Sequence, residues 1–510
     1  MKRMLYLSHR WLGIILCLFM AMWFVSGIVM LYVGYPKLTP AEHLAHLPPL
    51  ASDRLHIDLA QALQSTGKAE TPDTVRLTSI NAAPRFVFGY GKTQIAVDGE
   101  TGEKIVGIST NQALTTATGF LVDADAEYLG KIDEDPWTHS RALDPHRPLH
   151  RVQMADTANT LLYISDSTGE VVRDAPRQER LWNWIGSWLH WLYPFRGGVL
   201  NAYAADIIIY SALAGSLLSL VGLSVGLLRW RFSGHYRRGG KSPYRDNWLR
   251  WHHLTGLVFG LFTLTWVASG LFSMNPWKMF DSGFTPNVKH YQGGDITPMH
   301  FVLPVPQAIQ HFQNQGFKPC ELEWRLVNGN AYYLAMDAAG HSRLIAANGL
   351  NTTVFERIDW QILKQAAQAM LAPAQPSAKQ ILQQYDFYYY ARAAHTMTGH
   401  IEKRLPVLRL EFNDSVGTWL QIDPYTGDFQ KLDRLKRLSR VLFGLLHSWD
   451  WLPLLGSRPL WDGLMIFFSL GGFMLSLFGA VIAWRRLRIK FGSKKSTRAA
   501  AHFHQSTANQ

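Results

Sequence analysis

Four of the 20 histidines occupy related positions beside long apolar segments of the chain. His9 and His252 each come just before such a segment begins, and His190 and His447 each precede another one. Neutral imidazole nitrogens bind haem iron, and two imidazoles that face each other across a helix bundle can hold a b-type haem. The residue types and their positions therefore favour haem-iron sites built from these four side chains.

An internal repeat relates the four histidines to one another. His9-Arg10-Trp11-Leu12-Gly13 aligns with His252-His253-Leu254-Thr255-Gly256, and Val25-Ser26-Gly27 aligns with Ala268-Ser269-Gly270 at the same offset. A second offset aligns Leu189-His190 with Leu446-His447, and Ser219-Leu220-Val221-Gly222 with Ser476-Leu477-Phe478-Gly479. Self-similarity of this kind predicts two halves of similar structure, related by an axis along the membrane normal.

The repeat also predicts how the histidines pair. Pairing within one half would separate two ligands by about 30 Å, the thickness of the hydrocarbon core. Pairing across the halves instead brings His9 to His252 and His190 to His447, because each couple then lies near the same membrane face. We therefore predict two haem b sites, one at each face, with these four histidines as the iron ligands.

One choice at the first pair stays open, and two arginines beside the pair have an expected role. His253 is an alternative to His252, since a shift of the alignment by one residue exchanges the two. Arg10 and Arg250 stand beside the pair, and they are expected to bind the haem propionates through charge-assisted hydrogen bonds.

The elements that must position these histidines are four apolar segments without Asp, Glu, Lys or Arg. They are residues 11–36, 207–228, 254–277 and 463–484. About 20 apolar residues in a helix cross the hydrocarbon core of a bilayer. The segments therefore predict four membrane-spanning helices, and they exclude a purely soluble enzyme.

The basic residues indicate the orientation of these helices. The net charge is +12, and the excess of Lys and Arg lies in residues 1–10, 229–253 and 485–498. Basic flanks of membrane helices face the cytoplasm, so both termini are expected there and membrane lipid, not nucleic acid, is the expected partner. Residues 37–206 and 278–462 are then exported, which predicts a multi-pass protein of a Gram-negative inner membrane with two large periplasmic domains.

The two exported segments have the composition of α+β domains. Runs rich in β-forming residues, such as 85–90, 161–165 and 408–412, are separated by turns that begin with Asp and end with Gly. We expect the following organisation: 1–36 first membrane helix; 37–180 exported domain 1; 181–231 interfacial aromatic helix and second membrane helix; 232–251 cytoplasmic loop; 252–277 third membrane helix; 278–437 exported domain 2; 438–486 interfacial segment and fourth membrane helix; 487–510 basic tail.

Several motifs resemble the PepSY domain and the PepSY-associated transmembrane helix family. They are Asp98-Gly99-Glu100-Thr101-Gly102, Asp135-Pro136-Trp137-Thr138, Pro145-His146-Arg147-Pro148-Leu149, Leu189-His190-Trp191-Leu192-Tyr193, Trp251-His252-His253-Leu254-Thr255-Gly256, Ser269-Gly270-Leu271-Phe272-Ser273-Met274-Asn275-Pro276 and Leu446-His447-Ser448. The resemblance covers nearly the whole chain up to about residue 490. It implies two PepSY-like domains, and it implies a haem-dependent reductase of ferric siderophores or another iron-regulated membrane protein.

Other histidines lie in the exported segments. His139, His146 and His150 cluster in a loop that contains proline, and His395 and His400 occupy a similar place in the second segment. Metal binding requires three or four converging ligands, which the spacing in a loop does not establish. A role in binding metal or a ferric chelate and an ordinary structural role both remain open for these five residues.

Missing motifs limit the source of electrons. No Gly-x-Gly-x-x-Gly follows a strand, no P-loop occurs, and the cytoplasmic segments are too short for a nucleotide-binding domain. We therefore expect no bound nucleotide, with electrons supplied by a membrane quinol or a separate reductase and accepted by a ferric siderophore. The absence of Cys-x-x-Cys-His excludes covalent c-type haem.

One alternative belongs to a different functional class. PepSY-like domains resemble inhibitory propeptides, so the chain could be a haem-free, membrane-anchored module that binds or regulates periplasmic peptidases through strand edges. Four repeated spans with matched histidines exceed what anchoring needs, which favours electron transfer.

Overall fold

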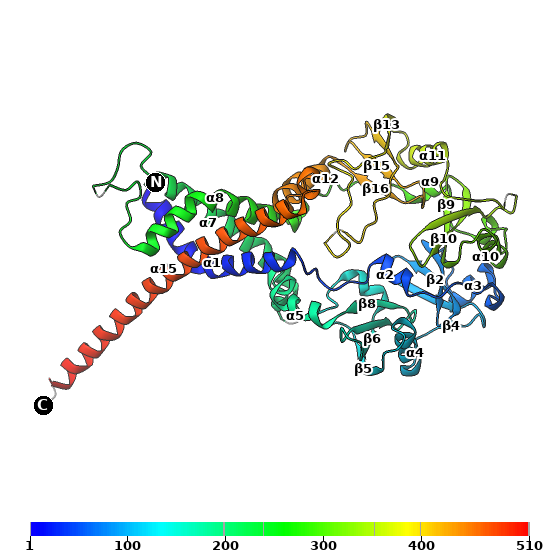
Figure 1. Cartoon of the computed structure of the whole chain (residues 1–510), viewed down its shortest axis with the longest axis horizontal. Coiled ribbons are helices and arrows are strands. Elements are labelled where there is room, and N and C mark those ends of the chain that lie inside the picture. The colour runs from blue at the N-terminus through cyan, green and yellow to red at the C-terminus, as the bar shows by residue number, and fades with distance from the viewer. Residues whose placement is uncertain (1, 197–198, 238, 351, 398, 508–510) are drawn as a thin grey trace. The chain divides into compact units, whose positions relative to one another are not determined.

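The computed structural model describes residues 2–196, 199–237, 239–350, 352–397 and 399–507, with side chains as far as Lys490 (Figure 1). The chain forms two compact units. The helical unit comprises Met1–Tyr32, Trp184–Phe280 and Leu438–Gln510, and the sheet unit comprises Val33–Asn183 and Asp281–Arg437.

Four long helices make up most of the helical unit. They are α1 (Lys2–Met30), α7 (Ala204–Arg229), α8 (Asn247–Ser273) and α15 (Arg458–Thr507). Within the described residues, four helical segments are long and apolar enough to cross a membrane: Lys2–Met30, Asn201–Arg229, Asn247–Ser273 and Arg458–Lys490. The prediction of four membrane helices is confirmed.

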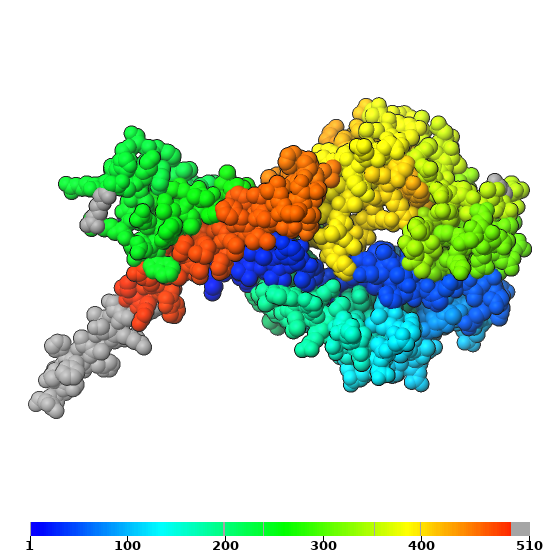
Figure 2. Space-filling model, in the orientation of Figure 1, coloured from blue at the N-terminus to red at the C-terminus, as the bar shows by residue number. Residues whose placement is uncertain are grey.

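These helices pack in a ring of neighbours. α1 and α8 each contact both α7 and α15 (Figure 1). The surfaces of α1, in dark blue, and α15, in orange to red, adjoin in Figure 2. Residues far apart in the sequence are therefore brought together inside one bundle.

Two of the helices end before the charge-free segments do. α1 ends at Met30, a turn follows at Leu31–Tyr32, and Pro36 disfavours a return to helix at the residue that precedes it. α8 ends at Ser273, and Asn275 then adopts the left-handed conformation (φ 46°) immediately before Pro276.

Short helices precede two of the long ones. The aromatic segment near residue 185 is not one helix: α5 (Arg177–Ile185) and α6 (Ser187–His190) are separated at Gly186. In the second half, α12 (Arg434–Ser439), a π-helical turn (Arg440–Leu445), α13 (Leu446–Ser448) and α14 (Leu452–Leu455) precede α15. His190 ends α6 and His447 lies in α13, so single helical turns present both rings to the bundle.

Three antiparallel sheets build the sheet unit. The shared sheet contains, in order, β12 (Val354–Phe355), β11 (Ser342–Ala346), β10 (Asn330–Asp337), β9 (Pro319–Val327), β1 (Thr74–Ile80), β2 (Ala83–Tyr90), β3 (Thr93–Asp98) and β4 (Lys104–Ile105). The second sheet contains β5 (Ala126–Ile132), β6 (Leu149–Met154), β7 (Leu161–Ser165) and β8 (Val171–Ala175). The third sheet contains β13 (Pro376–Leu382), β14 (Val407–Phe412), β15 (Trp419–Ile422) and β16 (Phe429–Leu432).

The shared sheet corrects the expectation of two separate exported domains at 37–180 and 278–437. β1 of the first segment pairs antiparallel with β9 of the second, with Leu77 opposite Leu322 and Thr78 opposite Glu321. The sequence predicts strands but not this pairing, because each strand has the same alternating pattern whichever neighbour it takes. Each segment therefore contributes four strands to one sheet and keeps a four-stranded sheet of its own.

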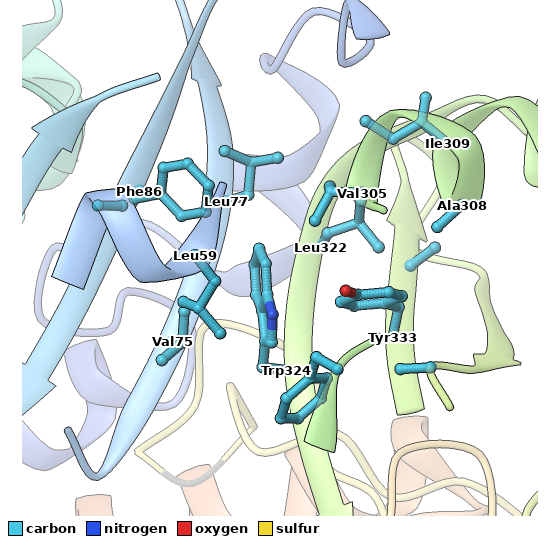
Figure 3. Close-up of a cluster of buried hydrophobic side chains, with 14 of the residues drawn as sticks. Leu59, Val75, Leu77, Phe86, Val305, Ala308, Ile309, Leu322, Trp324 and Tyr333 are labelled. Atoms are coloured by element: carbon cyan, nitrogen blue, oxygen red, sulfur yellow. The ribbon is translucent and has the colours of Figure 1, made fainter. Parts of the chain in front are cut away.

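A continuous hydrophobic core crosses the junction between β1 and β9. Helices α3 (Leu59–Thr66) and α10 (Val305–Asn314) bring Leu59, Val305 and Ile309 toward Phe86 and Trp324 of the shared sheet (Figure 3). The sheet unit also contains four helices outside this argument, namely α2 (Pro40–Ala45), α4 (Thr110–Phe120), α9 (Val288–Gln292) and α11 (Trp360–Leu371). The core residues of both segments thus exclude water from one another, which binds the two segments into one unit.

The Asp–Gly turns form as the sequence predicts, with one exception. Asp98 accepts a hydrogen bond from the Thr101 amide, and Gly102 has a φ of 76° that glycine adopts without strain. Asp166 instead directs its carboxylate away from its own turn, where it accepts hydrogen bonds from Lys131 and the amide of Ile108.

Candidate functional site

The helical unit brings the four histidines together in two pairs. The ring centroids of His9 and His252 lie 6.0 Å apart with an interplanar angle of 27°. The ring centroids of His190 and His447 lie 6.4 Å apart with an angle of 65°. These are the couples that the sequence repeat predicts, and each contains one ring from each half of the chain.

The two pairs lie at opposite ends of the bundle. His9 and His252 stand near the beginnings of α1 and α8, whereas His190 contacts Ser26 near the end of α1. The 17 residues from His9 to Ser26 correspond to about 26 Å of helix. The pairs are therefore separated by most of the thickness of a membrane core.

Hydrogen bonds hold the second pair by its Nδ1 atoms. The Nδ1 of His190 lies 3.0 Å from Oγ of Ser26, and this hydroxyl donates to the carbonyl of Trp23. The Nδ1 of His447 lies 3.2 Å from Oγ of Ser269 and 3.1 Å from the carbonyl of Trp266. A hydrogen bond at Nδ1 fixes the ring and leaves Nε2 as the neutral acceptor.

The first pair is oriented by backbone carbonyls. The Nδ1 of His252 lies 3.1 Å from the carbonyl of Leu475 on α15. The carbonyl of Leu218 on α7 lies near His9 but does not reach hydrogen-bond geometry, so among the described residues His9 Nδ1 is buried without a hydrogen-bond partner. The offset that relates Leu218 to Leu475 is the offset that relates His190 to His447.

A glycine lies against each of the four rings. A Cβ atom added at Gly222 would be 2.7 Å from Cε1 of His9, and one added at Gly479 would be 3.3 Å from Cε1 of His252. The corresponding distances are 3.6 Å for Gly27 with His190 and 3.3 Å for Gly270 with His447. The sequence leaves open whether these glycines serve helix packing or clearance for a cofactor; the contacts show that they accommodate the imidazole rings.

His253 has a different environment from His252. Its Nδ1 lies 2.8 Å from Oγ of Ser242, and its Nε2 lies 2.9 Å from the carbonyl of Gly226. Tyr244 packs edge-on against the same ring. Both ring nitrogens are engaged with the protein, so His253 fastens the loop before α8 rather than offering a free nitrogen.

The geometry of the pairs fits a metal held between two imidazoles. Metal–imidazole nitrogen bonds are about 2 Å long, so the centroids of two imidazoles on opposite sides of one ion are about 6 Å apart. Arg10 adds a second feature, because its Nε is buried without a hydrogen-bond partner among the described residues next to His9. This donor suits an anionic group such as a propionate, whereas the Arg250 side chain is exposed.

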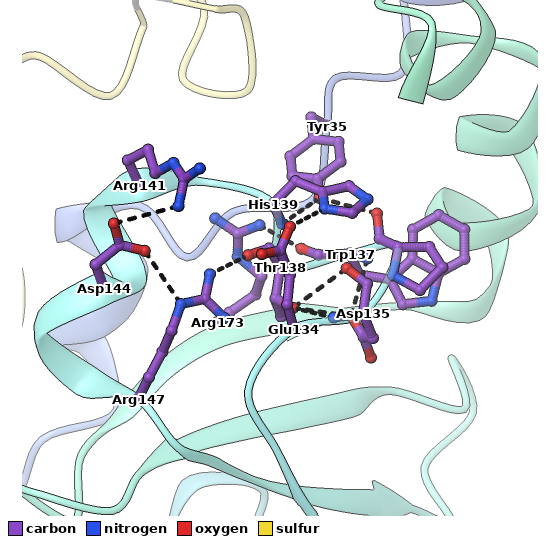
Figure 4. A network of polar contacts seen from close by, with 11 residues as sticks. Tyr35, Glu134, Asp135, Trp137, Thr138, His139, Arg141, Asp144, Arg147 and Arg173 are labelled. Carbon is purple, nitrogen blue, oxygen red and sulfur yellow. Dashed lines mark hydrogen bonds and ion pairs between the residues drawn. The ribbon is translucent and has the colours of Figure 1, made fainter. Parts of the chain in front are cut away.

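The other five histidines do not converge on one point. His139 pairs with Glu134, and its amide donates to the hydroxyl of Tyr35, within a loop network that also holds Arg147 and Asp144 (Figure 4). The remaining four are apart from it: His146 contacts Ser165, His150 contacts Tyr128 and Asp166, His395 contacts Glu42, and His400 is exposed. Among the described residues these five form no shared metal site.

One buried cluster of charged residues is not indicated by any motif in the sequence. Arg76 on β1 binds both carboxylate oxygens of Glu170 at 2.6 and 2.9 Å, and it binds Glu321 on β9 at 2.5 Å. The Nε2 of His43 on α2 lies 3.8 Å from Glu170 and 3.7 Å from Glu321. We name these four residues the junction cluster, because Arg76 and Glu321 lie where β1 meets β9.

Charge interactions dominate the titration of the junction cluster. Burial alone would lower the pKa of His43, but the carboxylates of Glu321 and Glu170 raise it above its usual value. Burial would raise the pKa of both glutamates. Arg76 and His43 instead hold the pKa of Glu170 well below its ordinary range, and they hold the pKa of Glu321 below its ordinary range. No spacing in the sequence identifies this cluster, since its members come from four distant segments.

Comparison with known proteins agrees with the geometry of the helical unit. A family model described as the PepSY-associated TM region matches residues 6–317, which is more than half of the 510 residues and includes α1, α7, α8 and strands β1–β8. No curated protein matches the chain. The matched range holds His9, His190 and His252, and His447 lies beyond it. The chain belongs to the family of proteins with a PepSY-associated transmembrane region.

Proposed function

We propose that the chain is a di-haem b electron-transfer protein of the inner membrane, and that it reduces a ferric chelate, such as a ferric siderophore, on the periplasmic side. The observation that carries this proposal is the pairing of four histidines from different halves of the chain at centroid distances of 6.0 and 6.4 Å. The proposal extends the family membership of the chain to a reaction.

The ligand atoms support haem rather than a small metal ion. Within the part of the chain that the structure describes, each pair offers two imidazoles and no third ligand, whereas zinc and related ions take at least three protein ligands. A haem iron needs only two axial ligands from the protein, because the porphyrin supplies the rest. Among the described residues the buried Nε of Arg10 has no hydrogen-bond partner, which agrees with an anionic group at the first pair.

A bound haem b supplies one-electron chemistry between Fe(III) and Fe(II). His9 with His252, and His190 with His447, would each hold one haem by their imidazole nitrogens. The function of such a site is therefore electron exchange. One site near each end of the bundle is the arrangement that transfer across a membrane requires.

The orientation of the chain follows from its charges. Bases gather in residues 229–253 and after 485, which supports a cytoplasmic position for these segments and a periplasmic position for the sheet unit. His190 and His447 each contact a serine in the same way, and each segment contributes four strands to the shared sheet. Both observations support an origin of the chain by duplication. Cytoplasmic segments this short favour a membrane quinol or a separate reductase as electron donor.

Reduction would release the metal from a siderophore. Hard oxygen donors bind Fe(III) more tightly than Fe(II), so adding one electron to each ferric chelate weakens its hold on the iron. The electron comes from the quinol or reductase, and the chelator itself is unchanged.

A haem assay of the purified full-length protein tests this proposal. We expect a pyridine haemochrome assay to give two haem b per chain, and we expect the native protein to show α-bands that appear on reduction and disappear when a ferric chelate is added. His9→Ala and His190→Ala should each lose one haem, and His253→Ala serves as the matched control that keeps both. A colourless preparation would refute the haem sites and favour the peptidase-binding alternative.

A further inference from the structure

The second histidine pair has hydroxyl partners that the first pair lacks. Ser26 and Ser269 each place Oγ beside the Nδ1 of a histidine, at 3.0 Å from His190 and 3.2 Å from His447. Both serines are fully buried, with 0 % of their surface exposed. The first pair faces backbone carbonyls of Leu218 and Leu475 instead.

The hydroxyl protons determine the direction of these hydrogen bonds. Ser26 donates its proton to the carbonyl of Trp23 at 3.0 Å, and Ser269 donates to the carbonyl of Trp266 at 3.0 Å. A serine that donates elsewhere presents lone pairs to the imidazole, so each ring carries its proton on Nδ1 and donates it to the serine. The bare Nε2 of each ring is then available to a metal.

The two serines differ in what remains when the hydroxyl is removed. His447 Nδ1 also lies 3.1 Å from the carbonyl of Trp266, so this ring keeps an acceptor without Ser269. The carbonyl of Trp23 also faces His190, but among the described residues the contact at Nδ1 that reaches hydrogen-bond geometry is the one to Ser26. Water is a poor substitute at either place, because neither serine is accessible to solvent.

We infer that Ser26 and Ser269 tune the reduction potential of the haem held by His190 and His447, with Ser26 having the larger effect. This inference rests on the proposed function. A hydrogen bond from the second nitrogen of a ligating imidazole makes the ligand more basic. A more basic ligand stabilises Fe(III) relative to Fe(II), so the serines keep this potential low.

The serines are positioning residues and would not touch the substrate. Their role differs from that of the glycines, which make room for the rings. It also differs between the two ends of the bundle, so the two haems are expected to have different potentials even though their ligands are the same. A haem with hydroxyl partners on both rings can be adjusted by single substitutions that leave the ligands in place.

Redox titration of the full-length protein tests the inference. In Ser26→Ala we expect the midpoint of one haem to rise, with about a tenfold change in its ratio of oxidised to reduced form at a fixed potential, which is 59 mV for one electron. The other haem should be unchanged. Ser269→Ala should give a smaller shift of the same sign, and Ser219→Ala, whose hydroxyl bonds the carbonyl of Gly215, should give none.

Haem content distinguishes a failure of the proposed function from a failure of this inference. Absence of haem b from the wild-type protein would refute the proposed function, whereas two haems with an unshifted midpoint in Ser26→Ala would refute this inference alone. If Ser26→Ala loses a haem, Ser26→Cys decides, because a thiol fills nearly the same volume and is only a weak acceptor. An intermediate upward shift in Ser26→Cys supports the inference, and an unchanged potential overturns it.

Discussion

Each paired histidine has its Cε1 edge against a glycine, and the tightest of these contacts is at Gly222. A methyl group there would lie 2.7 Å from Cε1 and 3.0 Å from Nδ1 of His9, which is closer than unbonded atoms approach. Since no residue that the structure describes donates or accepts a hydrogen bond at His9 Nδ1, the ring would be displaced rather than the helix. We expect Gly222→Ala to reduce the haem content from two toward one per chain.

The control for this substitution lies on α15. A Cβ added at Gly463 meets no atom within 4 Å, so Gly463→Ala changes helix propensity alone and should keep both haems. Equal haem content in Gly222→Ala and Gly463→Ala, measured by pyridine haemochrome, would contradict the role of Gly222.

The junction cluster shows what a buried ion pair contributes in the sheet unit. Arg76 pairs with both Glu170 and Glu321, whose side chains are only 2 % and 6 % exposed. Removing the guanidinium leaves the two buried carboxylates with His43 as their remaining partner in the junction cluster, and breaking a buried pair in this way typically costs about 3 kcal/mol. We therefore expect Arg76→Met to lower the free energy of unfolding of the sheet unit by about this amount. Arg54→Met, which breaks the more exposed pair with Glu100, should cost under about 1 kcal/mol in the same denaturation experiment.

The charge of His43 makes the stability of the sheet unit depend on pH. Two carboxylates and one guanidinium leave the junction cluster one positive charge short, and a proton on His43 supplies it. Because the carboxylates raise the pKa of His43 in the folded protein, this stabilisation is complete below the unfolded value near 6.5 and is lost as the pH rises through the folded pKa. The difference in unfolding free energy between wild type and His43→Gln should therefore be largest in acid and shrink as the pH rises. A difference that grows with pH in a series of thermal melts would contradict this assignment.

At the scale of elements, two glycines of α15 leave space for aromatic rings from the neighbouring helices α1 and α8. A Cβ added at Gly472 would lie 2.3 Å from Cζ of Phe24 on α1, and one added at Gly471 would lie 2.2 Å from Cδ1 of Phe259 on α8. Phe24 is buried and packs near Trp266, so it has little room to move. Overpacking of this kind costs about 1–3 kcal/mol.

Gly472→Ala should therefore lower the melting temperature of the detergent-solubilised protein. Adding Phe24→Leu removes the ring that the new methyl group meets, so the double variant should recover part of the loss. The lone substitution Gly463→Ala again provides the control, since its Cβ has open space. An unchanged melting temperature in Gly472→Ala would mean that α1 and α15 are less closely packed than their contacts indicate.

Single elements were predictable from the sequence where their pattern is local. Apolar length predicts the four membrane helices, and a β-forming run predicts strand β7 (Leu161–Ser165) at its observed bounds. The repeat predicts which histidines meet, because it adds a relation between distant segments. His43, Arg76, Glu170 and Glu321 had no such relation, so their contact depends on strand pairing that no local pattern encodes.

At the scale of the whole molecule, each unit is assembled from segments that are far apart in the chain. The helical unit combines three segments, and the sheet unit combines two. In both, residues from the two halves meet at a central junction: the histidine pairs in one unit, and β1 with β9 in the other. A domain boundary drawn along the sequence therefore does not correspond to a folding boundary.

This arrangement predicts that damage in one segment of the sheet unit spreads to the other. Leu322 on β9 is fully buried opposite Leu77 of β1, and Leu322→Ala removes core volume at the cost of about 3 kcal/mol. In hydrogen-exchange mass spectrometry, protection should fall in β1–β4 as well as in β9–β12, because the shared sheet opens as one cooperative unit. Val106→Ala, at a side chain that is 90 % exposed, should leave the exchange unchanged. If the loss of protection were confined to residues 281–437, the two segments would be independent domains that merely touch at β1 and β9, and the junction cluster would hold them together only weakly.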